Sequence, residues 1–205
     1  FYLEQALAPE GARGDIELRA RAWNEYESAD LGAADVVVAG SAGADARLDA
    51  PILRRFAGAG GRVVVFIAPG LEEFAAALSA HDPVIAPRPR DEGFLEPLRP
   101  ESASGLFVPF GREDLDGFSR ARLRGAPAVR GIPACDVLAR VSDGAPLAWR
   151  EEVGAGEILF VAIDPTPDGG DLVLSPYFLP LAQQRVLARL GDVPSTAGAL
   201  VGGTV

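Results

Sequence analysis

The sequence predicts an α/β fold with a central, mainly parallel sheet that ends in an antiparallel C-terminal meander. Two continuous apolar runs, at 35–39 and 63–68, are typical of buried strands, because helices cover both faces of a parallel sheet. A helical pattern between the two runs completes a strand–helix–strand unit. Three strand-like runs nearer the C-terminus are joined by short turns, which favour hairpins.

The N-terminal half supplies the parallel part of this sheet. Residues 1–7 carry apolar groups at helical spacing, which predicts a short helical turn. Residues 16–23 alternate apolar with charged side chains, as in a strand with one wet face near a sheet edge. Asp49 can cap the helix of the strand–helix–strand unit, and the glycine-rich stretch at 58–61 can end it. A second helix is predicted over 71–79.

The second half is predicted to begin with loops and to end with the meander. From His81 to about Gly117 the chain is rich in proline and glycine, and we expect little regular structure there. A short stretch at 119–124 alternates weakly between apolar and charged residues. The meander strands are predicted at 136–141, 145–153 and 157–162. If the middle strand is regular, Trp149 shares a face with Leu147, Glu151 and Val153.

The most apolar decapeptide, LVLSPYFLPL at 172–181, contains two prolines four residues apart. Ser175 suits a helix N-cap and Pro176 a first helical residue, but Pro180 would then remove an early backbone hydrogen bond. We therefore predict an irregular or 3₁₀ turn over 176–179 and a regular helix over 180–190.

The whole sequence fits one domain, predicted over 1–192, followed by a flexible tail of small residues over 193–205. Exposed parts of Leu172, Tyr177 and Phe178, in the apolar decapeptide, are candidates for a contact patch with a partner protein.

Composition excludes several classes of function. The net charge is −10, which disfavours nucleic acid and anionic lipid as partners. All 19 basic residues are arginine, so no lysine Schiff base or phosphate-loop lysine is available. A single cysteine excludes an internal disulfide and a cysteine-rich zinc site, and a single histidine excludes a multi-histidine metal centre. We predict no cofactor and no metal.

The turn after the second apolar run is where related folds carry a nucleophile. In hydrolases and amidotransferases of this class, a Ser or Cys sits in a tight turn between strand and helix. Here the turn reads Pro69-Gly70-Leu71-Glu72-Glu73 and contains no Ser, Cys or Thr. The two glutamates also place negative charge on the first helical turn, where an oxyanion would need stabilisation. We predict no catalytic residue there.

Other candidate sites remain open. A crevice at the carboxyl ends of the parallel strands could hold a small molecule near Gly40, Ser41, Pro69 and Gly70. Cys135 could act as a nucleophile with His81 as its base, provided that the two side chains come within hydrogen-bond reach or lie one water apart. The alternative is that both residues have structural roles. Cys135 would then be a packed or half-exposed thiol, and His81 a residue that interacts with the end of a helix.

The loop at 164–171 carries three aspartates among prolines and glycines. Asp164, Asp168 and Asp171 could bind calcium, but their spacing is not that of a helix–loop–helix calcium site. Turn carboxylates that cap the local backbone are the expected alternative.

Five segments, in order, resemble the glutamine-amidotransferase-like domain of Bat-type (aerotolerance) bacterial membrane proteins, which also carry a von Willebrand A domain and N-terminal membrane helices. The segments are FYLEQAL (1–7), DVVVAG (35–40), LRRFAGAGGRVVVFIAPG (53–70), VLARVSDGAPLAWREEVGAGEILFVAID (137–164) and LVLSPYFLPL (172–181). The resemblance implies a three-layer flavodoxin-like sandwich related to class I amidotransferases, usually without the catalytic cysteine. Family members tend to carry a tryptophan in the loop before the LSP motif, whereas residues 166–170 contain none.

This resemblance implies a non-catalytic domain of a larger bacterial membrane-anchored protein that acts as a protein-interaction or ligand-sensing module. The chain begins at Phe1 and contains no methionine, as expected of a piece of a longer protein. We expect a soluble domain, on the periplasmic rather than the cytoplasmic side, whose partners are other protein domains and which meets the membrane only through segments outside this chain. The alternatives are a divergent amidotransferase or hydrolase that uses Cys135 and His81, and a small-molecule binder that uses the crevice.

Overall fold

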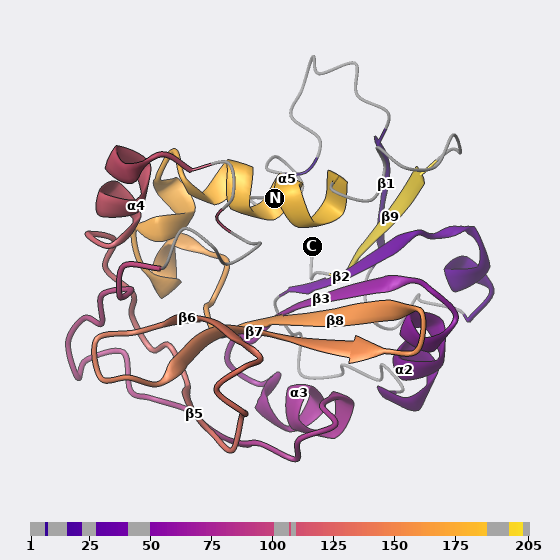
Figure 1. The fold of residues 1–205 in the computed structure, drawn as a ribbon, viewed down its shortest axis with the longest axis horizontal. Helices are drawn as coiled ribbons and strands as arrows, with labels where there is room; N and C mark the ends of the chain where they lie inside the picture. Colours follow the sequence, from indigo (N-terminus) through magenta and orange to yellow (C-terminus); the bar gives the residue numbers. More distant parts are fainter. Residues whose placement is uncertain are drawn as a thin grey trace.

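A seven-stranded sheet forms the centre of the structure, with strand order β1-β9-β2-β3-β8-β7-β6 (Figure 1). The computed structural model describes residues 7, 16–21, 28–40, 50–100, 107, 110–187 and 197–202. The strands of this sheet are β1 (Ile16–Arg21), β2 (Val36–Gly40), β3 (Arg62–Phe66), β6 (Val137–Arg140), β7 (Pro146–Val153), β8 (Gly156–Val161) and β9 (Ala197–Gly202). The helices are α2 (Ala50–Gly58), α3 (Glu72–Leu78), α4 (Arg112–Phe118) and α5 (Phe178–Leu187). Short 3₁₀ turns are η1 (Ser28–Ala33), η2 (Pro167–Gly169) and η3 (Leu172–Leu174).

The pairing of the strands confirms the predicted α/β class. From β1 through β9, β2 and β3 to β8, every neighbouring pair is parallel. The last two pairs, β8 with β7 and β7 with β6, are antiparallel and form the C-terminal meander. The edge position of β1 also agrees with its predicted wet face, since Glu17 and Arg19 are exposed there.

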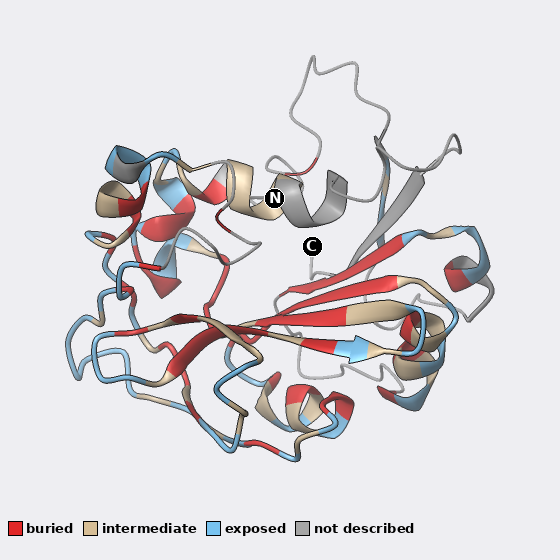
Figure 2. Cartoon of the chain, in the orientation of Figure 1, coloured by how far each residue is buried: buried red, intermediate tan, exposed pale blue. Residues whose placement is uncertain are grey.

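Helices cover both faces of the sheet, so each face has its own hydrophobic core (Figures 1 and 2). Alternate residues of β3 point to opposite sides, with Val63 and Val65 in one core and Val64 and Phe66 in the other. The core beneath α2 and α3 contains Leu53, Leu71, Leu78, Trp149 and Phe160. The core beneath α4 and α5 contains Phe107, Leu115, Phe118, Leu172 and Phe178. Strands buried on both faces are therefore continuously apolar, as the runs at 35–39 and 63–68 predicted.

The prediction of a flexible tail is wrong for residues 197–202. They form β9, which lies between β1 and β2 and pairs in parallel with both. The backbone of a central strand is hydrogen-bonded on both sides, and the two neighbouring strands come from the other end of the chain. The central sheet therefore includes the chain as far as Gly202. The other tail residues and residues 1–6 lie outside the described residues.

The middle of the chain holds more regular structure than its proline and glycine content predicted. Helix α4 lies in the segment that was expected to be loops, and Asp114 accepts a hydrogen bond from the backbone N–H of Gly111 at its start, at 3.0 Å. Two three-residue strands, β4 (Val84–Ala86) and β5 (Ala128–Arg130), form a separate antiparallel pair. The stretch at 119–124 forms no strand; Leu123 makes isolated bridges to Leu95 and Gly170.

The apolar decapeptide begins its helix earlier than predicted. The 3₁₀ turn lies before Ser175, at η3, and α5 already begins at Phe178. Pro180 therefore falls in the first turn of α5, where backbone N–H groups have no intrahelical acceptor, so its missing N–H costs little. Ser175 was predicted as a helix N-cap, but its hydroxyl instead donates to the carbonyl of Leu172 in the preceding 3₁₀ turn, at 2.6 Å.

Leu147 and Trp149 do not share a face, because the strand is not regular, which was the condition of that prediction. Leu147 belongs to the core beneath α4 and α5, whereas Trp149 belongs to the core beneath α2 and α3. The register between β6 and β7 shifts on both sides of the Ala139–Ala148 pair. Such an irregularity adds a residue to the alternation, and residues two apart then point to opposite faces.

Candidate functional site

The turn after β3 leads from a strand into a helix, which is where a nucleophile elbow would lie, but the backbone N–H of Gly70 is already hydrogen-bonded. Pro69 and Gly70 are exposed where the chain leaves β3 for α3, and Gly70 has a φ of 92°. The backbone N–H of Gly70 donates to the Glu72 carboxylate at 2.7 Å. An oxyanion hole needs free N–H groups, and a carboxylate on this one places negative charge where an oxyanion would form.

The predicted crevice residues lie at the carboxyl ends of β2 and β3 without enclosing a described cavity. Gly40 is the buried last residue of β2, and Ser41 lies outside the described residues. An apolar cavity of about 50 Å³ does occur, between the sheet and helices α4 and α5, but Gly40, Pro69 and Gly70 do not line it. Its lining is entirely apolar, and small-molecule sites usually occupy roughly 300 Å³ or more, so the cavity is better explained as loose packing.

The proposed contact patch on the decapeptide is wrong for two of its three residues. Leu172 and Phe178 are buried in the core, at 3% and 4% exposure. The Phe178 ring packs on Phe66 with centroids 6.1 Å apart. Tyr177 is half-buried, and a side chain at Gly117 of α4 would collide with its ring, so it also faces the domain.

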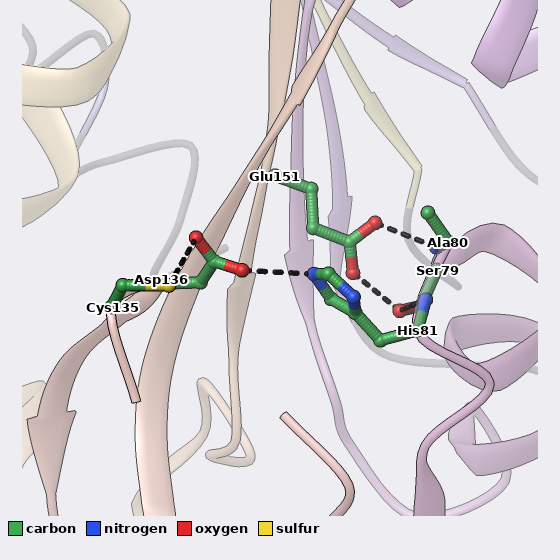
Figure 3. A network of polar contacts seen from close by, with 6 residues as sticks. All are labelled: Ser79, Ala80, His81, Cys135, Asp136 and Glu151. Atoms are coloured by element: carbon green, nitrogen blue, oxygen red, sulfur yellow. Dashed lines mark hydrogen bonds and ion pairs between the residues drawn. The ribbon is translucent and has the colours of Figure 1, made fainter. Parts of the chain in front are cut away.

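Cys135 and His81 do come together, but through a third residue (Figure 3). The His81 Nε2 lies 3.0 Å from Asp136 Oδ2, and the Cys135 thiol donates to Asp136 Oδ1 at 3.6 Å. The carboxylate therefore separates the thiol from the imidazole. A cysteine nucleophile needs its base on the thiol itself, and no hydrogen bond joins these two groups in the described part of the chain.

The same network continues into the protein through Glu151 (Figure 3). Ser79 donates its hydroxyl proton to this buried carboxylate, and the backbone N–H of Ala80 donates to the second oxygen at 2.7 Å. The Ser79 hydroxyl also accepts from the backbone N–H of His81 at 3.1 Å. Glu151 thereby anchors the chain at the end of α3 to β7, which is a structural role.

Replacing Glu151 with alanine is expected to lower the free energy of unfolding by about 2 kcal/mol, because the Ser79 hydroxyl and the Ala80 N–H lose a charged acceptor. The adjacent E152A is the matched control, since Glu152 is exposed and should change stability by less than about 0.5 kcal/mol. Urea unfolding followed by circular dichroism measures both. Equal effects of the two substitutions would contradict the anchoring role.

The prediction that the aspartates of the 164–171 loop cap the local backbone is wrong, because these side chains bind distant segments. Asp164, just beyond β8, accepts from the Arg90 guanidinium at 2.5 Å, and Asp168 lies 3.7 Å from the same group. Asp171 accepts from the backbone N–H of Arg122 at 2.6 Å. In the described residues, no group of three or more His, Cys, Asp or Glu side chains is arranged to hold a metal ion.

Two arginines beside the 164–171 loop were not predicted as site residues. Arg122 and Arg124 both lie over the exposed ring of Phe94, with Cζ atoms 5.5 Å and 4.7 Å from the ring centroid. We call Phe94, Arg122 and Arg124 the arginine–phenylalanine cluster. The weak alternation at 119–124 was the available signal, because it places two arginines on one exposed side of an extended segment.

Comparison with known proteins identifies the fold but no family. No family model matches the chain, and no curated protein matches it. A cytoplasmic protein from Salmonella typhimurium LT2 is similar in structure, with a TM-score of 0.62 at 14% identity over 89% of this chain and 83% of that chain. A second cytoplasmic protein from Salmonella typhimurium has a TM-score of 0.63 at 14% identity over 88% and 82%. A β-galactosidase from Rahnella sp. R3 has a TM-score of only 0.47, with 14% identity over 86% of this chain and 23% of that chain.

The expectation of a domain from a membrane-anchored protein, on the periplasmic side, is contradicted. Two solved structures that share the overall fold are named cytoplasmic proteins. Among the described helices, none has both the length and the apolar character needed to cross a bilayer. At 14% identity, what these comparisons establish is that the chain has the same mixed α/β fold as two cytoplasmic proteins.

Proposed function

We propose that this chain is a non-catalytic ligand-sensing module with a three-layer, flavodoxin-like fold of the class I amidotransferase-like type. The observation that carries the proposal is the hydrogen bond from the Gly70 N–H to the Glu72 carboxylate, at 2.7 Å. It occupies the donor of the elbow turn, and the residues from Pro69 to Glu73 offer no nucleophile. The names of the two structural neighbours suggest the cytoplasm as the compartment in which the module works.

A divergent cysteine hydrolase is the rival function, because Cys135 and His81 share the Asp136 carboxylate. The arrangement works against it. A thiol that donates to a carboxylate is not being deprotonated by an imidazole, and the His81 Nε2 is turned toward the same carboxylate. Cys135 is also exposed, so the described part of the chain does not exclude water from it.

The experiment that separates the two functions measures hydrolysis of glutamine and of p-nitrophenyl acetate. We expect the unaltered protein to release ammonia or nitrophenol no faster than a Cys135→Ser/His81→Gln double variant. The melting temperatures of both proteins, compared by circular dichroism, check that the double variant is folded. Turnover that the unaltered protein shows and the double variant loses would reject the non-catalytic function.

A further inference from the structure

The arginine–phenylalanine cluster brings two positive charges to one aromatic ring. The Cζ atoms of Arg122 and Arg124 lie 5.5 Å and 4.7 Å from the centroid of the same ring. Arg122 and Arg124 are exposed, and Leu123 between them is buried. Residues two apart on an extended segment point to the same side. Neither guanidinium has a carboxylate partner among the described side chains.

The backbone beneath these arginines is fixed before any ligand arrives. Leu123 and Leu95 exchange both backbone hydrogen bonds, at 2.8 and 2.9 Å. On the other side, the Arg124 N–H donates to the Gly169 carbonyl at 2.9 Å, and Asp171 holds the N–H of Arg122. A binding group mounted on a preorganised backbone loses less conformational entropy when it binds.

Three other arginines, by contrast, are paired with carboxylates. Arg88 lies 2.5 Å from Asp143, Arg90 lies 2.5 Å from Asp164, and Arg99 lies 3.2 Å from Asp116. The aromatic ring attracts the guanidinium groups of Arg122 and Arg124, but it does not cancel their mutual repulsion. An anion placed between them would remove that repulsion. Because the chain carries a net charge of −10, a long polyanion is disfavoured and a compact anion fits better.

We propose that Arg122 and Arg124, mounted over Phe94, bind the phosphate group of a phosphate monoester. The inference deepens the proposed function and rests on it, because it names the ligand class that the sensing module takes. A guanidinium fork binds two oxygens of one group. One carboxylate, with two oxygens, satisfies a single fork, whereas the three terminal oxygens of a phosphate monoester can be shared between two forks. Both forks lie over the Phe94 ring, with Cζ atoms 5.5 Å and 4.7 Å from its centroid.

A titration with inorganic phosphate at constant ionic strength tests the site. In ¹H–¹⁵N spectra we expect saturable shifts of the backbone amides of Arg122, Leu123 and Arg124. The R122Q/R124Q double variant should raise the dissociation constant at least about ten-fold, since it removes charge-assisted hydrogen bonds. R120Q is the matched control, because Arg120 is exposed on the same segment and lies over no ring among the described residues. Its dissociation constant should stay within about two-fold of that of the unaltered protein.

Three results of the phosphate and acetate titrations would overturn the site: unchanged binding by R122Q/R124Q, an equal loss in R120Q, or acetate that saturates the same amides as tightly as phosphate. Glycerol phosphate and a short phosphoserine peptide then distinguish the sources of the monoester. Tighter binding of either supports the site, and binding of neither overturns it. The proposed function fails separately, because hydrolysis by the unaltered protein would leave the phosphate titration intact.

Discussion

Replacing Trp149 with alanine is expected to lower the free energy of unfolding by about 3–5 kcal/mol, the range seen for large aromatic residues in well-packed cores. Trp149 is fully buried in the core beneath α2 and α3. Its ring stacks on Phe160 of the neighbouring strand, with centroids 4.8 Å apart and planes 9° from parallel. Alanine would leave a cavity between the sheet and the helices that rigid neighbouring strands cannot close.

Two further variants sharpen this prediction. W149F keeps an aromatic ring against Phe160 and removes the indole Nε1, which is buried without a partner among the described residues, so it should cost less than half as much as W149A. F94L changes an aromatic residue at the surface and should cost about 1 kcal/mol or less. Urea unfolding followed by far-ultraviolet circular dichroism measures all three without relying on tryptophan emission. A loss below about 1 kcal/mol in W149A would show that this core repacks.

Replacing Gly156 with alanine is expected to cost about 3 kcal/mol, because the substitution forces atoms into the backbone rather than into a movable side chain. Gly156 begins β8, and a Cβ there would overlap the carbonyl oxygens of Gly61 and Ala57. Those oxygens belong to the end of α2 and the turn that leads into β3. The absence of a side chain is thus what allows the β7–β8 hairpin to lie against the end of α2.

Gly58→Ala is the matched control for that substitution. Gly58 is the last residue of α2, and a Cβ there would meet nothing within 4 Å. Its φ is not positive, so alanine should stabilise the protein by about 0.5 kcal/mol through the lower entropy of the unfolded chain. Both variants replace a glycine with alanine, but the free energy of unfolding is expected to fall in Gly156→Ala and to rise in Gly58→Ala. The same urea series measures both. A loss in Gly58→Ala comparable to that in Gly156→Ala would mean that the close approach is not the cause.

Burial periodicity made most of the sheet predictable. The continuous apolar runs became β2 and β3, and the turns at Ser142–Gly144 and Gly154–Gly156 became the hairpins of the meander. These features depend on residues that are close in sequence, so a local pattern carries them. Helix α4 also had a local signal, in Glu113 and Asp114 at its first turn, but the surrounding prolines and glycines outweighed it.

The candidate site could be predicted only as separate residues. The absence of a nucleophile between Pro69 and Glu73 was visible in the sequence, but the hydrogen bond from Gly70 to Glu72 depends on the conformation of the turn. Asp136 meets His81 across 55 positions, and Phe94 meets Arg124 across 30. A contact between side chains so far apart in the sequence leaves no periodic pattern from which it could be predicted.

The sequence by itself determined the α/β class, the two-faced burial of β2 and β3, the antiparallel meander and the lack of an elbow nucleophile, because each depends on residue type and short-range spacing. Only the tertiary structure decided that residues 197–202 enter the sheet between β1 and β2, that Leu172 and Phe178 are buried, and that two arginines share one ring. Those outcomes depend on which groups far apart in the sequence become neighbours. Such contacts stabilise the protein only after folding has brought the distant segments together, at a cost in chain entropy.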